Sequence, residues 1–317
     1  MTERVHTASL TRSVRPFEAV VSPYHITTRE PAGLVALQIA QSATTLLLAP
    51  QALGADRQAV REAARRSPVY RAYMESWEWA MPLFREGVLG STDGGEDPVE
   101  DVRDACLKLH HDDACAPLRP LLRQELFEDD TVYLRAASAD VLKAGPDPGV
   151  SIPIAAGLDA FAAAREMIVV RSAASSVVQR AESRLGRVVF RTSVPALIRG
   201  SAERVLLVRA LLGEARDRLG REIALAFESG DPSGVRAAAS GYADAFEQER
   251  SDILAPPGIE EEDEVRVVPG EASLVGVELP RDAVFSSSIA AATGRAPRAE
   301  APDGFVRTIL IRSIGGR

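Results

Sequence analysis

The chain of 317 residues has few of the side chains that most often carry chemistry, with two cysteines and four histidines. Two cysteines cannot form a disulfide framework in a protein of this size, so we expect a reducing cytoplasm. The N-terminus shows no signal-peptide organisation, which agrees with that location. Lysine is also scarce, with only Lys108 and Lys143, so the basic side chains are almost all arginine.

Positive charge is in deficit as well, because the net charge is −8 and the isoelectric point is near 5.3. No run of basic residues is longer than Arg65-Arg66. Nucleic acid is therefore not expected as a partner, since nonspecific binding needs a basic surface. A membrane is not expected either. Residues 31–55 carry no charge, but polar side chains interrupt them, and the pattern favours a buried helix that Pro50 ends.

Several catalytic and nucleotide-binding motifs are missing. The sequence has no Gly-x-Ser-x-Gly nucleophile elbow, no kinase glycine loop and no phosphate-binding loop with its lysine. The turn that follows an expected strand at residues 167–171 contains no glycine, so it lacks the dinucleotide fingerprint. We therefore identify no nucleotide-binding motif, and the cofactor stays unknown.

The densest group of reactive side chains lies in one ten-residue window, where a metal is possible. If residues 98–111 are helical, Cys106 and His110 share one face at a spacing that suits zinc. The same window also fits a helix that ends at the histidines and a second helix capped by an aspartate. This structural interpretation is favoured over a metal site. The candidate metal ligands are Cys106, His110, His111, Asp113 and Cys115.

The clearest helical period runs through residues 56–90, where apolar residues recur every three or four positions. Ser67-Pro68 suits a helix cap and first position, so two helices are expected here. Aromatic side chains gather in the second helix and favour a core more than a ligand pocket. If they do line a pocket, its candidate residues are Tyr70, Tyr73, Trp77 and Trp79.

We expect a mainly α fold with a minor β component (α+β), in which a helical body precedes a small β-rich C-terminal portion. The breaks at residues 144–149 and 255–264 predict three parts. The parts are an N-terminal helical part at 1–143, a helical part with a possible strand-helix-strand unit at 150–254, and a β-rich segment at 264–317.

Individual elements follow from apolar periodicity and from turn residues. A helix is expected to begin near Thr27 or Thr28, just after His25. The C-terminal strands are expected to pair with one of the two earlier strands. The expected strands lie within 12–24, 167–171, 187–192, 265–268, 273–279 and 305–311, and further helices at 155–165, 172–185, 201–228 and up to 254.

Three functional hypotheses result. The first is a non-catalytic cytoplasmic interaction protein (a scaffold, adaptor or regulatory subunit) with a protein partner, and with a homo-oligomer left open. The second is an enzyme, possibly metal-dependent, whose site joins residues 106–115 to His25. The third is a small-ligand-binding protein that uses the aromatic group. The first hypothesis is preferred because recognisable catalytic motifs are missing.

Overall fold

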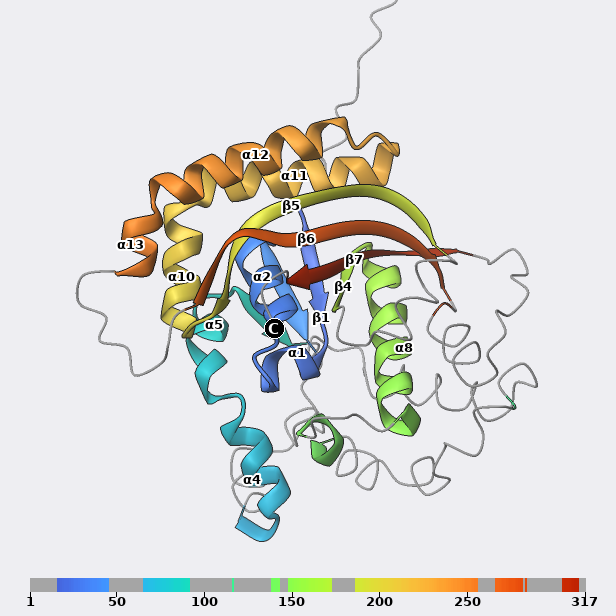
Figure 1. Cartoon of the computed structure of the whole chain (residues 1–317). Coiled ribbons are helices and arrows are strands. Elements are labelled where there is room, and N and C mark those ends of the chain that lie inside the picture. The colour runs from blue at the N-terminus through green and yellow to red at the C-terminus, as the bar shows by residue number, and fades with distance from the viewer. Residues whose placement is uncertain are drawn as a thin grey trace, which may run out of the picture.

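The computed structural model of the chain describes residues 16–45, 65–91, 116, 138–142, 148–172, 186–255, 266–281, 283 and 304–313. Its centre is a seven-stranded mixed sheet in the order β3-β2-β1-β4-β7-β6-β5 (Figure 1). Strands from all three predicted parts of the chain therefore lie in one sheet. None of the described helices has both the length and the apolar composition that crossing a membrane requires.

The first five strands in this order are parallel. They are β3 (Leu89–Ser91), β2 (Ser42–Thr45), β1 (Glu18–Val21), β4 (Ile168–Ser172) and β7 (Phe305–Ser313). Val20 pairs with Thr44 on one side and with Val169 on the other. Parallel strands of this kind occur in sheets that helices cover on both faces. β1 shows this burial, because Ala19, Val20 and Val21 are all buried.

The other edge of the sheet is formed by two long strands. β6 (Arg266–Pro280) pairs antiparallel with both β7 and β5 (Arg187–Arg199). Both strands curve strongly over the molecule (Figure 1). The β5–β6 register shifts between Val194 and Ala196, around Pro195, which cannot donate a hydrogen bond to a ladder.

Helices cover the sheet on two sides. α2 (Pro31–Ile39) connects β1 to β2, whereas α8 (Pro148–Arg165) leads into β4 on the other side of β1. Because these connections cross the sheet in opposite directions and such crossovers are right-handed, α2 and α8 lie on opposite faces. Figure 1 shows them on either side of β1 and β4.

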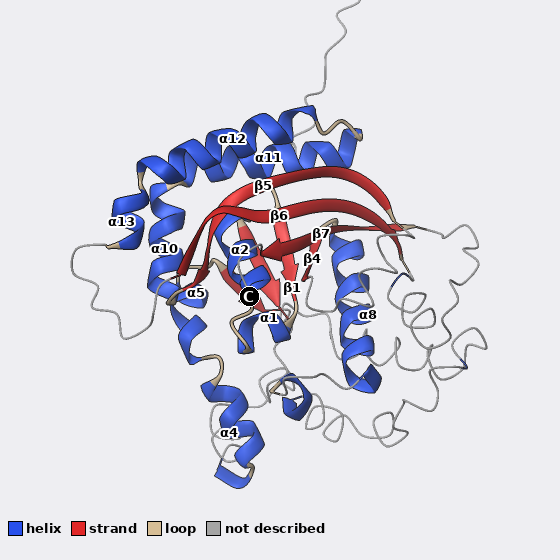
Figure 2. Cartoon of the chain, viewed as in Figure 1, coloured by secondary structure: helices blue, strands red, loops and turns tan. Residues whose placement is uncertain are grey.

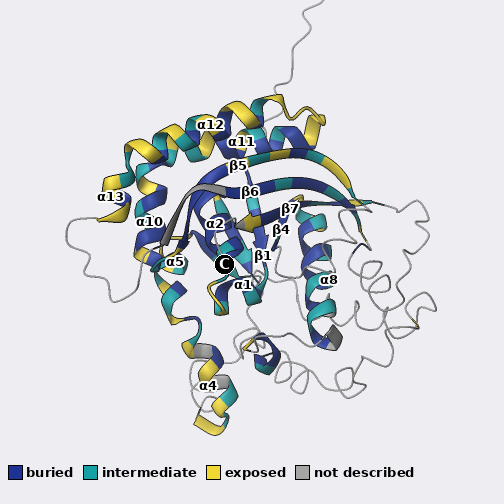
Figure 3. Cartoon of the chain, viewed as in Figure 1, coloured by how far each residue is buried: buried dark blue, intermediate teal, exposed yellow. Residues whose placement is uncertain are grey.

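A second group of helices extends the layer that contains α2. It consists of α10 (Ala202–Leu211), α11 (Gly213–Ser229), α12 (Ser233–Gln248) and α13 (Arg250–Leu254). α11 and α12 lie over the long strand β5, with their exposed faces turned outward (Figure 3). The remaining described elements between β2 and β3 are α4 (Pro68–Glu75), the 3₁₀ helix η2 (Glu78–Ala80) and α5 (Met81–Arg85).

The main hydrophobic core lies between this helical layer and the sheet. Leu34, Leu37 and Ile39 of α2 are fully buried and belong to one cluster with Tyr242 and Phe246 of α12. Figure 3 shows the burial of α2 and of the central strands. Almost every residue of α2 is buried, so this helix lacks the polar face of a surface helix.

The predicted fold class is wrong. The chain is an α/β protein with a seven-stranded mixed sheet, and its β structure is not confined to a small C-terminal portion (Figure 2). The buried helix expected to run as far as Pro50 stops at Ile39, and β2 follows at Ser42–Thr45. Ser42, Thr44 and Thr45 suited the polar positions of a helix. Four-residue parallel strands are too short to show a period of their own.

Other expected elements are confirmed. β1 lies within 12–24, and β4 and β5 begin close to the predicted strands. The C-terminal strands pair as expected, β7 with β4 and β6 with β5. The helix expected at 201–228 is divided at Leu212 into α10 and α11. Of the helix expected at 172–185, Ser172 belongs to β4 and the remaining residues lie outside the described part of the chain.

Candidate functional site at the carboxyl ends of the parallel strands

The strand order changes direction next to β1. The chain moves from β1 to β2 and β3 on one side, and β4 then pairs with β1 on the other side. Open α/β sheets bind their ligands at such a switch point, in the crevice outside the carboxyl ends of the strands. In this chain the residues that follow the carboxyl end of β1 form α1 (Pro23–Thr27). The described part of the candidate site is therefore built around α1.

Local sequence explains why α1 begins at this point. Ser22 has extended backbone angles, and its Oγ accepts a hydrogen bond from the Tyr24 amide at 3.3 Å. Pro23 occupies the first helical position, where its missing N–H costs nothing. The Nδ1 atom of His25 accepts from the Ser22 amide at 3.4 Å, which completes a capping box. Glutamate or glutamine is the usual residue at that position, so histidine is a departure from the motif.

His25 is buried, with 5% of its surface exposed. Its Nε2 lies 3.5 Å from Glu30 Oε2, at the connection between α1 and α2. Burial lowers the pKa of His25, and the negative charge of Glu30 opposes that shift in part. The imidazole is therefore neutral at pH 7. Since Nδ1 accepts from Ser22, we assign the proton to Nε2, which faces Glu30.

A second polar pair extends from the same short helix. The Tyr24 hydroxyl donates a hydrogen bond to Oδ2 of Asp140, a residue 116 positions later in the sequence. Asp140 lies in a helical turn at residues 138–141 and is 1% exposed. This contact holds the 138–141 turn against α1, at the carboxyl end of β1.

An aromatic side chain supports the turn between α1 and α2. Trp79 Nε1 donates to the Ile26 carbonyl at 2.9 Å, and the Arg29 guanidinium lies 5.3 Å from the centre of the Trp79 ring. Arg29 itself has a φ of 49°, in the left-handed region that few non-glycine residues adopt. The contacts of Trp79 thus stabilise the connection that carries Glu30.

β4 contributes a buried ion pair close to its carboxyl end. Arg171 pairs with Asp159 of α8, and the second carboxylate oxygen of Asp159 has no hydrogen-bond partner in the part of the chain that the structure describes. Burial raises the pKa of Asp159, whereas the charge and hydrogen bond of Arg171 oppose the shift. At the end of β2, the Thr45 hydroxyl is fully buried and has no hydrogen-bond partner among the described residues. Unsatisfied buried groups are rare, and water, an ion or a ligand is a common explanation for them.

Gly33 holds α1 close to α2. A Cβ at position 33 would lie 2.7 Å from the His25 Cβ and 3.1 Å from the His25 carbonyl oxygen. Neither atom can move without moving the helix backbone, so a larger side chain would separate the two helices.

We expect Gly33→Ala to lower the free energy of unfolding by about 1–3 kcal/mol, the usual cost of overpacking, measured by urea denaturation. Gly213→Ala is the matched control, because nothing lies within 4 Å of that Cβ at the start of α11. Alanine favours a helix, so the control should be neutral or slightly stabilising. Equal stability of the two variants would contradict the tight α1–α2 contact.

The sequence-predicted site residues have different outcomes. The candidate metal ligands Cys106, His110, His111, Asp113 and Cys115 lie outside the described residues, so the metal hypothesis stays a prediction. Within the described ranges, no three histidine, cysteine or acidic side chains form a group that could hold a metal ion. His25 was named as a partner of that window, and the structure places it at the switch point.

The predicted aromatic group is distributed over α4 and the turns after it. Tyr73 and Trp77 are buried in the main core, with ring centres 5.8 Å apart in an edge-to-face arrangement. Trp79 is partly buried and binds the α1 backbone, and Tyr70 also lies in α4. Within the described ranges, the Trp77 Nε1 has no hydrogen-bond partner. A ligand pocket lined by these residues remains a prediction.

Tyr24, Asp140, Asp159 and Arg171 were missed in the sequence. Tyr24 is adjacent to His25 and could have been found from the helix start that follows a buried strand. Asp140 gives no local signal, because its partner is 116 positions away. Asp159 and Arg171 look like ordinary surface charges until the pairing of α8 with β4 is known.

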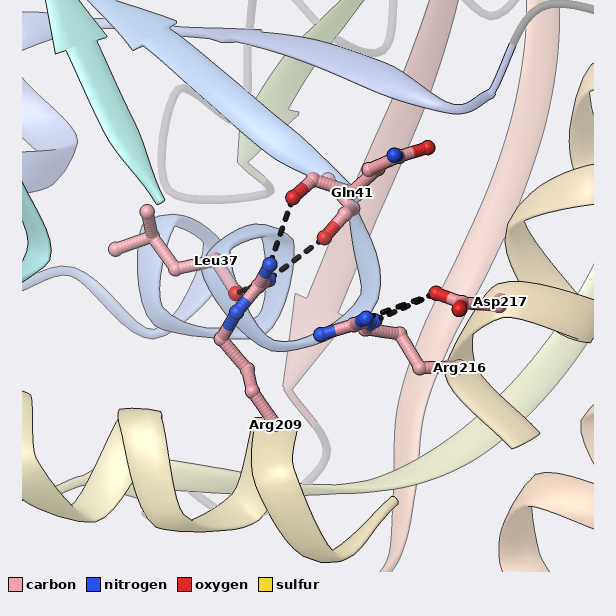
Figure 4. Close-up of polar contacts among 6 residues, drawn as sticks. Leu37, Gln41, Arg209, Arg216 and Asp217 are labelled. Carbon is pink, nitrogen blue, oxygen red and sulfur yellow. Dashed lines mark hydrogen bonds and ion pairs between the residues drawn. The ribbon is translucent and has the colours of Figure 1, made fainter. Parts of the chain in front are cut away.

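A further polar cluster lies at the opposite end of α2. The Arg209 Nη1 donates to the carbonyls of Leu37 and Ala40 at 2.5 and 2.6 Å, and Nη2 donates to the Gln41 carbonyl at 2.7 Å (Figure 4). Burial and nearby Arg216 lower the pKa of Arg209 to about 10, so it stays charged at neutral pH. Arg216 itself is paired with Asp217. Because Arg209 satisfies the terminal carbonyls of α2, we assign it a structural role.

Comparison of the chain with protein families, with curated protein sequences and with solved structures found no match. The functional argument therefore depends on the geometry of the site.

Proposed function

We propose that the protein binds a small polar molecule at the carboxyl ends of β1, β2 and β4. The observation that supports this proposal is the position of α1. The Tyr24–Asp140 pair and the His25–Glu30 pair both lie where the strand order changes direction. Ligands of open α/β sheets bind at this place in the fold.

The chemistry of the described groups favours a ligand with hydrogen-bonding groups. The Tyr24 hydroxyl donates its hydrogen to the Asp140 carboxylate, and the hydroxyl oxygen can accept a hydrogen bond from a ligand. The Thr45 hydroxyl adds a buried group at the end of the neighbouring strand, and no described residue is its hydrogen-bond partner. His25 contributes to the site through the fold, because its Nδ1 accepts from the Ser22 amide and its Nε2 faces Glu30.

The test is a ligand screen with matched tyrosine variants. Carboxylates, sugars, amines and nucleotides are screened by thermal shift, and the affinity of each hit is then measured by titration calorimetry. Tyr24→Phe should weaken binding roughly tenfold or more, because a hydrogen bond to a charged group contributes about 1.5–3 kcal/mol. Tyr242→Phe is the control, since it removes a buried hydroxyl of α12 that forms no hydrogen bond with any described residue.

Two results would count against the proposal. A ligand whose affinity is the same in the wild type and in Tyr24→Phe binds elsewhere. A screen without hits, together with a stoichiometric protein recovered from native cells, would favour the untested hypothesis of an interaction protein. Ligand binding that is weakened only by the Tyr24 substitution would support the proposed site.

A further inference from the structure

We propose that His25 is a pH-sensitive latch, and that protonation of its imidazole releases α1 from the end of β1 and from α2. The latch is a property of the folded chain alone. Its consequence for ligand binding rests on the proposed function.

The latch follows from the two contacts of the imidazole. In the neutral form Nδ1 accepts a hydrogen bond from the Ser22 amide, and this bond is half of the capping box that starts α1. A protonated imidazole carries hydrogens on both nitrogens and cannot accept. Protonation therefore places the Nδ1–H of His25 opposite the Ser22 N–H. Two donors then face each other, and the Ser22 amide loses its acceptor.

Packing prevents His25 from moving away while α1 stays in place. The imidazole is buried, and Gly33 of α2 lies against the His25 Cβ and carbonyl. The Glu30 amide also donates to the His25 carbonyl at 2.9 Å. Because Gly33 and the Glu30 amide hold the His25 backbone in place, water can reach a charged imidazole only if α1 is displaced as a unit.

Few charges face the imidazole in the described structure. Glu30, at the connection to α2, is the one whose charge affects His25, and it favours protonation. α2, which packs against α1, has no titratable residue between Pro31 and Ile39. Asp140 meets α1 through the Tyr24 hydroxyl, and Arg29 lies over the Trp79 ring. Among the described residues, the charge of Glu30 is the one that counteracts the lowering of the His25 pKa by burial.

The direction of the pH effect follows from the pKa of His25 in the folded state and in the open state. Burial lowers the pKa of His25 in the folded state below the ordinary value of 6.5. The open state therefore binds more protons, and closure is favoured above pH 6.5 and lost progressively as the pH falls below it. Because the open state protonates with the ordinary pKa of 6.5, the opening equilibrium can rise by at most about tenfold between pH 7.5 and pH 5.5.

The experiment is hydrogen exchange of the whole chain at pH 7.5 and pH 5.5, read by mass spectrometry and corrected for intrinsic exchange rates. The α1 amides should open more at the lower pH in the wild type, by up to about tenfold. His25→Gln is the matched variant, because glutamine can accept the Ser22 amide as the usual capping-box residue but does not titrate. In that variant the α1 opening should be the same at both pH values.

A second measurement does not depend on the variant folding well. The wild type, labelled with ¹³C-histidine, contains four imidazoles, and the resonance lost in His25→Gln identifies His25. Its titration midpoint should lie below 6.5 in the folded protein. A midpoint at or above 6.5, or an equal pH response of α1 in His25→Gln, would overturn the latch. Neither result depends on a ligand, so the failure of the latch and of the proposed function can be distinguished.

Discussion

Arg209→Leu should lower the free energy of unfolding by about 4 kcal/mol, from the loss of three charge-assisted hydrogen bonds at the end of α2. The leucine leaves the carbonyls of Leu37, Ala40 and Gln41 without the donor that now satisfies them. A buried acceptor without a partner costs about 1–3 kcal/mol. Water that reaches some of the three carbonyls keeps the total cost below three times that value. Urea denaturation, with the midpoint and slope compared, measures the change.

Two further variants separate this role from a general effect of charge. Arg209→Lys keeps the positive charge but lacks the planar fork that reaches three carbonyls, so it should recover only part of the loss. Arg218→Leu removes an exposed arginine from α11 and should change stability by no more than about 0.5 kcal/mol. Equal effects of Arg209→Leu and Arg218→Leu would contradict the capping role of Arg209.

Gln38→Leu should cost about 3 kcal/mol, because it leaves both backbone groups of a buried residue unpaired. The Gln38 side chain donates to the Leu197 carbonyl at 2.7 Å and accepts from the Leu197 amide at 2.9 Å. The side chain thus binds the edge of β5 as a neighbouring strand would, and it also donates to the Leu34 carbonyl at 2.9 Å. Leucine has a similar volume, so the loss measures hydrogen bonding more than packing.

The control is Gln248→Leu, at an exposed position at the end of α12, which should be close to neutral. The specific signature of Gln38→Leu is faster hydrogen exchange at the Leu197 amide. A variant as stable as the wild type, with unchanged exchange at Leu197, would show that Gln38 does not hold β5 on α2.

The sequence predicted local structure better than it predicted how the elements assemble. The long helix α11 and the strand β6 each have one mainly apolar face, and β7 contains the apolar run Ile309-Leu310-Ile311. β2 was missed because Ser42–Thr45 offers four residues without a hydrophobic pattern, and pairing with β1 and β3 determines its conformation. The parallel sheet itself depends on contacts between residues far apart in the chain, which a local pattern does not encode.

The candidate site was predictable only in part for the same reason. His25 could be named from its place before a helix, but its burial and its contact with Gly33 depend on how α1 and α2 pack. The Tyr24–Asp140 and Asp159–Arg171 pairs require the sheet order before they can be recognised. The buried hydroxyl of Thr45 gave no signal, since threonine is common at exposed positions.

The most direct test of the central claim is a crystallographic fragment screen with small polar compounds. The proposed function predicts that fragments gather at the carboxyl ends of β1, β2 and β4, within hydrogen-bond distance of the Tyr24 or Thr45 hydroxyl. Fragments bound reproducibly at another site, with none near these two hydroxyls in crystals where the site is open to solvent, would contradict it.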